Sequence, residues 1–318
     1  MVLEVFPILA AIPGLNVTER APLSEYTRFG LGGPALLLAD AHTEDALIRC
    51  VAAARAAEFP LALIGGGTNL VASDAGFPGL ALRYGAANLQ NKANCLEADS
   101  GAILQNLVDK SIELGLRGLE TMTGIPGWFG GALYGNAGAY GRSINELVES
   151  VRFFDGWSIR EIGNAECEFH YRESVFKRNK DWVILSARLK MTPAEPAGLR
   201  AIADGILKIR NEKYPPALLC AGSIFKNLIL AELPPFVQAQ VPLRVIREGK
   251  VPSAYFLEHV GAKGMILGGI RVAAYHANLL FNAGGGTASE VRQLIATLKA
   301  KVQASFGLEL EEEVQYLG

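Results

Sequence analysis

Glycine density in one segment constrains this chain more than any other feature of its sequence. Residues 123–141, TGIPGWFGGALYGNAGAYG, hold seven glycines in nineteen positions. A glycine inside a regular element costs about 0.5–1 kcal/mol relative to alanine, so this density requires a physical reason. Either the backbone turns tightly several times in this segment, or a ligand lies against main chain that side chains would block.

A second glycine-rich segment, GGGTN, occupies residues 65–69 and follows a short apolar run. It lacks the Rossmann fingerprint, because Leu70 stands where the third glycine is required, and the chain contains no Walker A sequence. Its consecutive backbone N–H groups, with Thr68 and Asn69 beside them, are typical of a concave site that holds a pyrophosphate. A turn that only joins two strands is the alternative interpretation.

These two segments lie about sixty residues apart, on successive parts of the chain that mix strand and helix patterns. Together they can line one extended ligand from both sides. A flat aromatic cofactor against bare backbone explains glycines that are interspersed with Pro126 and Asn136. The alternative is a glycine-rich structural crossover that binds nothing.

Apolar periodicity and capping residues predict the helices. Thr43 is a suitable N-cap for the first clear helix, and Pro60 ends it. Thr287 and Glu290 form a capping box before an apolar stripe that ends at Gly307. The expected helices cover residues 43–59, 101–114, 253–260 and 287–306.

Short apolar runs and one turn signal predict the strands. The pair Asp155-Gly156 lies between two apolar runs and predicts a hairpin over residues 151–162 with a type I′ turn. Strands and helices mix without strict βαβ alternation, so the fold class is α+β, with two or three domains and a boundary near residues 195–205. The other expected strands are residues 61–64, 79–83, a run that begins at Cys95, 182–191, 277–286 with its turn, and 308–317.

Charge and composition exclude several classes of protein. Thirty basic and 32 acidic residues give a net charge of −2, and no Lys/Arg cluster forms a nucleic-acid footprint. The apolar N-terminus lacks a basic region, and no run approaches the ~20 apolar residues of a membrane span. We therefore expect a soluble, cytoplasmic protein with no nucleic-acid or membrane partner.

Cysteine and histidine spacing indicates neither disulfides nor a metal centre. The four histidines form no H-E-x-x-H or other ligand spacing, so no metal is expected. No C-x-x-C pair occurs, and reduced thiols are expected for all the cysteines. These are Cys50, Cys95, Cys167 and Cys220.

Polar residues in three places are candidates for chemistry. Arg172 follows a strand-like stretch in YRES, where a solvated surface group is the common alternative. Ser223 is not part of a G-x-S-x-G elbow, so a hydroxyl that donates a proton or a hydrogen bond is more credible than a nucleophile. Glu311, Glu312 and Glu313 are either a solvated acidic run or part of a strand, in which Glu312 points away from the other two.

Taken together, these segments resemble the UDP-N-acetylenolpyruvoylglucosamine reductase family. The resemblance extends from about Leu23 to Gly318, and the order and spacing of its motifs are specific. The motifs are YTRFGLGGPA (26–35), GGGTNLVASDAG (65–76), GLETMTGIPGWFGGALYGNAGAYG (118–141), YRES (171–174), AGSIFKN (221–227), GAKGMILGGIRVAAYHANLLFNAGGGTASEV (261–291) and LELEEEVQYLG (308–318).

This resemblance implies an α+β, vanillyl-alcohol-oxidase-type (PCMH-like) FAD-binding fold. Two FAD-binding subdomains are expected over residues 1–84 and 85–205, and an α+β substrate-binding domain over residues 206–308. A C-terminal strand over residues 309–318 is expected to return to the active site.

The resemblance also implies FAD as a non-covalent cofactor, with no metal. In the family, GGGTN wraps the pyrophosphate, and the longer glycine-rich segment runs along the flavin and its ribityl–pyrophosphate arm. The residues that match these motifs are Gly65, Gly66, Gly67, Thr68, Asn69, Gly124, Ile125, Pro126, Gly127, Gly130, Gly131, Asn136, Ala137 and Gly138.

The activity implied is an NADPH-dependent oxidoreductase of peptidoglycan precursor synthesis. It reduces the enolpyruvyl group of UDP-N-acetylglucosamine enolpyruvate to UDP-N-acetylmuramate, and thereby serves cell wall biogenesis, cell shape and cell division. The expected partners are the UDP-sugar and NADPH, and the expected state is a monomer. The alternatives are a flavin oxidase of the same fold, acting on a hydroxyl substrate, and a non-catalytic paralogue that binds flavin or nucleotide sugar.

By motif match, Arg172 and Glu313 stabilise the charge that develops on the enolpyruvyl carboxylate, and Ser223 donates the proton. The expected substrate contacts are Lys213, Asn227, His276 and Asn278. No catalytic group is lost where this sequence departs from the family pattern. The departures are Gly30, Leu219, Cys220, Leu228 and Ala273.

Overall fold

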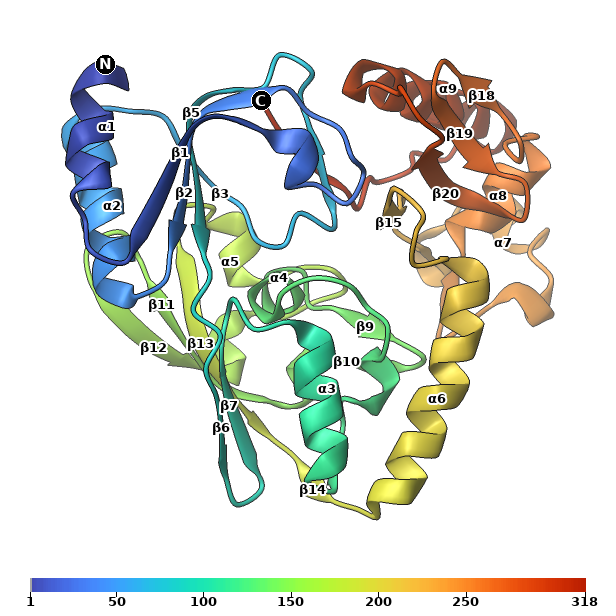
Figure 1. Cartoon of the computed structure of the whole chain (residues 1–318). Coiled ribbons are helices and arrows are strands. Elements are labelled where there is room, and N and C mark those ends of the chain that lie inside the picture. The colour runs from blue at the N-terminus through green and yellow to red at the C-terminus, as the bar shows by residue number, and fades with distance from the viewer. Residues whose placement is uncertain (1) are drawn as a thin grey trace. The chain divides into compact units, whose positions relative to one another are not determined.

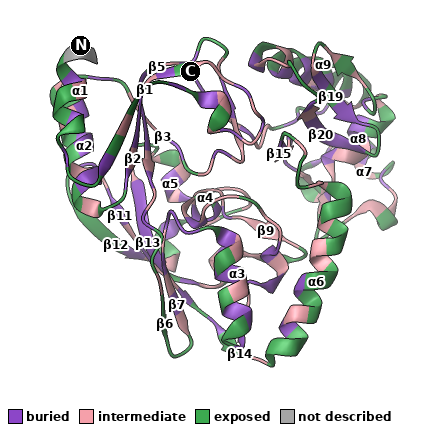
Figure 2. Cartoon of the chain, in the orientation of Figure 1, coloured by how far each residue is buried: buried purple, intermediate pink, exposed green. Residues whose placement is uncertain are grey.

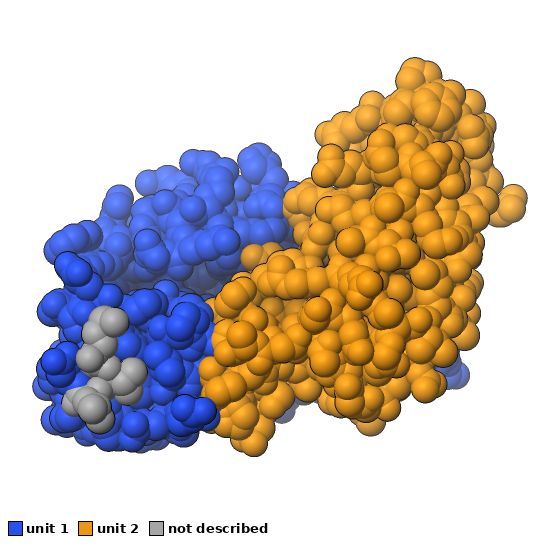
Figure 3. All heavy atoms as spheres, turned by 90° about the horizontal axis from the view of Figure 1, so that it is seen from above, with its two compact units in different colours: residues 1–21, 35–67, 77–212 blue, residues 22–34, 68–76, 213–318 orange. Residues whose placement is uncertain are grey.

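The computed structural model describes residues 2–318, with side chains from Glu4 onward, and Met1 lies outside the described residues. Helices and strands mix along the whole chain, as expected for the α+β class (Figure 1). The chain forms two compact units, coloured separately in Figure 3. Of the described residues, unit 1 contains 2–21, 35–67 and 77–212, and unit 2 contains 22–34, 68–76 and 213–318.

The first sheet of unit 1 has four strands and is covered by two helices, α1 (Val2–Ala10) and α2 (Glu44–Ala56) (Figure 1). Thr43 caps α2 as predicted, because its side-chain oxygen accepts a hydrogen bond from the N–H of Ala46. The second and fourth strands both pair with the third in parallel. In spatial order the strands are β1 (Leu15–Pro22), β2 (Pro34–Ala41), β5 (Phe77–Tyr84) and β3 (Leu61–Leu63).

The second sheet of unit 1 has five antiparallel strands and a separate apolar core that it shares with short helices. In spatial order the strands are β12 (Ile159–Gly163), β11 (Val148–Phe154), β13 (Val183–Lys190), β7 (Cys95–Asp99) and β6 (Leu89–Lys92). The helices that follow in unit 1 are α3 (Leu104–Glu113), α4 (Phe129–Tyr134), α5 (Val175–Arg178) and α6 (Pro196–Lys213). Two short pairs complete the unit: β8 (Leu116–Arg117) with β14 (Thr192–Pro193), and β9 (Gly138–Ala139) with β10 (Arg142–Ser143).

The predicted hairpin is confirmed as β11 and β12, but its predicted turn type is wrong. Only Gly156 has a positive φ, of 94°, whereas a type I′ turn requires positive φ at both central residues. Asp155 precedes the turn, and its carboxylate accepts hydrogen bonds from the N–H groups of Trp157 and Ser158. That side-chain interaction replaces the left-handed conformation we expected for Asp155.

Unit 2 has a four-stranded antiparallel sheet around which a third apolar core forms. The predicted capping box of α9 (Ala288–Phe306) is confirmed. The helix buries its apolar face and exposes the opposite face (Figure 2). The strands, in spatial order, are β15 (Cys220–Ser223), β20 (His276–Asn282), β19 (Ile270–Ala273) and β18 (Ile266–Leu267). Shorter elements are α7 (Pro235–Gln238), α8 (Ser253–His259), and the pair β16 (Leu228–Ile229) and β17 (Lys250–Val251).

The C-terminal strand is shorter than the predicted residues 308–317. Only β21 (Gln315–Leu317) forms a ladder, in parallel with β4 (Leu70–Ala72). Residues 311–313 instead hydrogen-bond through their backbone to residues 224–226 without a continuous ladder. The division into functional domains at residues 84 and 205 stays a prediction.

The cysteines and the helix lengths agree with two simpler expectations. The cysteines, all within the described part of the chain, are free thiols. Among residues 2–318, no helix combines the length and the apolar character required to cross a bilayer.

Candidate active site

The two glycine-rich segments meet at one point within unit 1. A Cβ added at Gly66 would lie 3.3 Å from the Cα of Gly127 and 3.2 Å from the ring of Trp128. That ring is covered by the guanidinium of Arg83, whose carbon lies 4.6 Å from the ring centroid. At this point the missing side chains permit the two backbones to approach each other.

Several predicted cofactor glycines also have a conformational or packing reason. Gly67, Gly124 and Gly127 have φ of +63°, +76° and +113°, a region that favours glycine. A Cβ at Gly130 would lie 2.7 Å from the Ser100 side chain, and one at Gly138 would lie 2.6 Å from a backbone oxygen. The protein itself therefore explains these five glycines.

Gly65 and Gly131 lack such a reason. Both are exposed, neither has a positive φ, and an added Cβ would meet no described atom within 4 Å. Close by in the sequence, the hydroxyls of Thr121 and Thr123 are buried and have no hydrogen-bond partner among the described residues. Open space beside bare backbone, and hydroxyls without partners at the start of the longer glycine-rich segment, fit a ligand such as the predicted FAD.

Arg172 holds the end of the longer glycine-rich segment. Its guanidinium donates hydrogen bonds to the carbonyl oxygens of Asn136, at 3.5 Å, and Gly138, at 3.0 Å. Lys177 Nζ donates to the Arg172 carbonyl oxygen over 2.9 Å. Arg172 has a φ of +59°, a strained conformation for a residue with a long side chain. The structure thus brings a predicted catalytic cation together with two predicted cofactor residues.

Asn136 itself is a structural residue of the same segment. It is buried with a φ of +41°; its Nδ2 donates to the His170 carbonyl over 2.8 Å, and its Oδ1 accepts from the Asn145 N–H. Ile125 and Ala137 pack against the second core of unit 1, whereas Pro126 is exposed. For these residues a contact with FAD stays a prediction.

In unit 2, hydrogen bonds link the Asn69 side chain to the backbone of Glu313, and Glu313 to the residue directly after Ser223. Asn69 Nδ2 donates to the Glu313 carbonyl over 2.9 Å, and the Glu313 N–H donates to the Ile224 carbonyl over 2.7 Å. Thr68 precedes Asn69 and is half-buried. Two predicted catalytic residues, Ser223 and Glu313, therefore lie on directly hydrogen-bonded segments of this unit.

Ser223 ends β15 and pairs with Leu279 of β20. The hydroxyl of Tyr214 lies 2.9 Å from Ser223 Oγ and 3.4 Å from His276 Nε2. Burial, and then the charges of Lys213 and Lys263, lower the pKa of His276 from 6.5 to about 3. His276 is therefore neutral near pH 7.

Asn278 fixes the backbone that follows Ser223. Its side chain, only 2% exposed, accepts from the Phe225 N–H and donates to the Phe225 carbonyl and to Ser253 Oγ. Asn227 Oδ1 accepts from the Ser253 N–H. Both predicted substrate contacts thus also hold the strand and loop in place.

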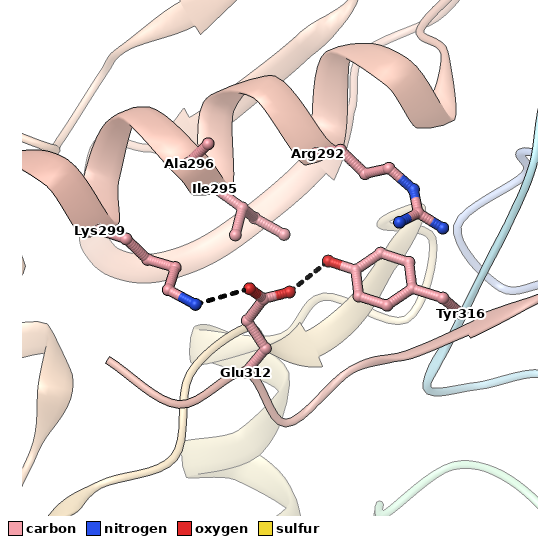
Figure 4. Close-up of a pocket in the computed structure, with 6 residues that line it drawn as sticks. All are labelled: Arg292, Ile295, Ala296, Lys299, Glu312 and Tyr316. Carbon is pink, nitrogen blue, oxygen red and sulfur yellow. Dashed lines mark hydrogen bonds and ion pairs between the residues drawn. The ribbon is translucent and has the colours of Figure 1, made fainter. Parts of the chain in front are cut away.

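The three consecutive glutamates have different surroundings. Glu311 pairs with the buried ammonium of Lys226 over 2.5 Å. Glu312 accepts from Lys299 Nζ at 3.0 Å and from the Tyr316 hydroxyl at 2.5 Å, at the edge of a hollow beside α9 (Figure 4). Glu313 remains the carboxylate proposed for catalysis.

Lys213 ends α6, is exposed, and places its Nζ 5.2 Å from the centroid of the Tyr214 ring.

Two of the departures from the family pattern, Gly30 and Leu219, lie next to each other. A Cβ at Gly30, where φ is +67°, would lie 3.3 Å from the Leu219 side chain. Sequence reasoning assigned no role to Tyr214, whose hydroxyl lies within hydrogen-bond distance of both Ser223 and His276. The only available signal was its position directly after Lys213.

Two parts of the chain each match a known protein family. Residues 35–157 match the family described as FAD binding domain. Residues 215–317 match the family described as UDP-N-acetylenolpyruvoylglucosamine reductase, C-terminal domain. The first match confirms the predicted FAD-binding fold and its cofactor.

Whole-length relatives carry the same name. The chain is 57% identical over 310 residues to UDP-N-acetylenolpyruvoylglucosamine reductase of Solibacter usitatus, which covers 98% of this chain and 99% of the relative. It is 34% identical to the reductase of Pediococcus pentosaceus over 98% of this chain and 97% of the relative. The crystal structure of the Thermus caldophilus enzyme matches 96% of this chain and 99% of its own, with a TM-score of 0.74 and 26% identity. The chain therefore belongs to the UDP-N-acetylenolpyruvoylglucosamine reductase family.

Proposed function

We propose that this chain is an FAD-dependent reductase that uses NADPH to convert UDP-N-acetylglucosamine enolpyruvate into UDP-N-acetylmuramate. The observation that carries this conclusion is the 57% identity over 98% of the chain to a reductase of that name. When bound, FAD would supply the hydride chemistry that connects NADPH with the enolpyruvyl methylene carbon. The net reaction adds one hydride and one proton across the double bond.

The residues of unit 1 support this chemistry by holding the cofactor. The open backbone at Gly65 and Gly131 suits contact with FAD, and Arg172 keeps the segment that ends at Gly138 in one conformation. We propose that Arg172 also stabilises the charge on the substrate carboxylate, as a fixed cation does in such sites.

The residues of unit 2 are proposed to handle the substrate. Ser223 gives its hydroxyl proton to the carbon beside the methylene, and Glu313 assists Arg172 in stabilising the charge. Binding of the UDP-sugar is assigned to Lys213, Asn227, His276 and Asn278. We further propose that the enzyme acts in the cytoplasm as a monomer and contributes to cell wall synthesis, and thereby to cell shape and division.

One experiment tests this function directly. The purified protein should show the visible spectrum of a flavin, and NADPH consumption should depend on the enolpyruvyl sugar nucleotide. An oxidase of the same fold would instead consume oxygen without NADPH. A non-catalytic paralogue would bind flavin or sugar nucleotide and leave NADPH unchanged.

A further inference from the structure

The environment of Ser223 contains a second hydroxyl for which the proposed function has no use so far. Tyr214 is half-buried, and its ring packs against the core of unit 2. Pro215 and Pro216 follow it, and a residue before proline is restricted to extended conformations. Packing and chain stiffness thus hold the Tyr214 hydroxyl where it lies, 2.9 Å from Ser223 Oγ.

The direction of the hydrogen bonds follows from His276. Its Nδ1 accepts from the Asn278 N–H over 3.4 Å, so in the neutral ring the proton is assigned to Nε2. Nε2–H then donates to the Tyr214 oxygen over 3.4 Å. With its oxygen accepting from His276, the Tyr214 hydroxyl has Ser223 Oγ at 2.9 Å as an acceptor for its own proton, and we assign the bond in that direction.

This direction matters for the chemistry of Ser223. If Ser223 donated to Tyr214, its proton would be held by the Tyr214 oxygen and would not be available to a substrate. With Tyr214 as the donor, the Ser223 proton is not bound by the Tyr214 oxygen and stays available to a substrate. We propose that Tyr214 is a positioning residue that orients the Ser223 hydroxyl and stabilises Oγ as its proton leaves, an inference that rests on the proposed function.

In the step itself, the Ser223 O–H bond breaks and a C–H bond forms on the substrate carbon, so negative charge remains on Oγ. The Tyr214 O–H donates to that charge, and a hydrogen bond to a charged oxygen is stronger than a neutral one. The Lys213 ammonium, 5.2 Å from the Tyr214 ring centroid, favours negative charge on the pair. A proton from water restores Ser223 after the product leaves.

The test compares the two half-reactions of the flavin-loaded enzyme by stopped-flow absorbance. Tyr214→Phe keeps the ring and removes the hydroxyl. We expect flavin reduction by NADPH to be unchanged and reoxidation by the enolpyruvyl sugar nucleotide to be about 10- to 100-fold slower, with little change in KM. The solvent deuterium isotope effect on reoxidation should increase, because proton donation becomes slower.

Tyr255→Phe is the matched control, since its hydroxyl donates to the Gln240 carbonyl in the same unit. It should leave both half-reactions unchanged. Tyr214→Phe combined with Ser223→Ala should be no slower than Ser223→Ala alone, because Tyr214 acts through Ser223.

The inference would be overturned by a wild-type rate of reoxidation in Tyr214→Phe, by an isotope effect unchanged from wild type, or by full additivity in the double variant. Equal slowing of both half-reactions would also contradict it, since that indicates a structural role. If the wild-type enzyme is not reoxidised by the sugar nucleotide, the proposed function itself fails.

Discussion

Arg172 Nη2 lies 3.0 Å from the carbonyl oxygen of Gly138, so the predicted catalytic cation also clamps the glycine-rich segment. A second hydrogen bond, from Nη1 to the Asn136 carbonyl, means that one guanidinium binds two carbonyl groups of the segment. A planar guanidinium can supply both donors at once, whereas an ammonium is a point charge. The positive φ of Arg172 shows that the surrounding structure maintains this arrangement against local preference.

Arg172→Lys should therefore impair both catalysis and cofactor retention. Loss of a fixed charged donor at such a site typically lowers turnover by about 10²–10³-fold, and we expect that range here. The measurements are steady-state kinetics and the flavin content of the purified protein. Arg178→Lys, at an exposed ion pair on α5, should change neither, and a fully active Arg172→Lys enzyme would disprove the role.

Gly131→Ala and Gly65→Ala should separate cofactor binding from folding. The added methyl meets no described protein atom, so the apoprotein should unfold at the same denaturant concentration or a higher one. Against bound FAD the same methyl would overpack the site at a cost of about 1–3 kcal/mol, which weakens binding about 5- to 150-fold. Gly205→Ala on α6, where space is also open, should leave FAD affinity unchanged. Flavin titration by fluorescence measures this, and unchanged affinity in both glycine variants would contradict the assignment.

Asn278→Ala should destabilise unit 2. It leaves the buried Phe225 N–H without its acceptor, and an unsatisfied buried group costs about 1–3 kcal/mol. It also removes the Asn278 donor from the Phe225 carbonyl, which keeps its bond from Ser253 Oγ at 3.3 Å. We expect a loss of about 2–4 kcal/mol in the free energy of unfolding, measured in urea. Gln303→Ala, exposed on α9, is the control and should change stability by less than about 0.5 kcal/mol. A small loss in Asn278→Ala would mean that the loop finds other partners.

His276 should make the protein less stable as the pH falls. Its pKa is about 3 in the folded chain against an ordinary value of 6.5, so below about pH 6.5 the unfolded state binds more protons. The contribution is complete above pH 6.5 and is lost on acidification at up to about 1.4 kcal/mol per pH unit. His276→Gln should reduce the pH dependence of the unfolding free energy between pH 7 and pH 5, measured by urea titration at each pH. The reduction should correspond to the uptake of about one proton fewer on unfolding.

Gln303→Ala on α9 is the control for that experiment, because Gln303 is exposed and the substitution changes no titratable group. Its slope should match that of the wild type. Equal slopes in wild type and His276→Gln would show that His276 does not titrate with a depressed pKa.

Much of the local structure was predictable because neighbouring residues determine it. The Thr43 cap, the Thr287–Glu290 capping box and the left-handed Gly307 all follow from a few adjacent side chains. The type I′ turn was wrong because Asp155 uses its side chain to bind the turn. The C-terminal strand was overextended because alternation alone does not reveal whether a partner strand continues.

The sequence by itself determined the family, the cofactor class and most helices and strands, since motif order and local capping are properties of the chain alone. Only the tertiary structure decided which distant residues meet. It placed Asn69 against the backbone of Glu313, paired β21 with β4, and brought the Tyr214 hydroxyl to Ser223. These contacts depend on the path of the whole chain, because hydrogen bonds between remote segments form only when many other residues are already packed.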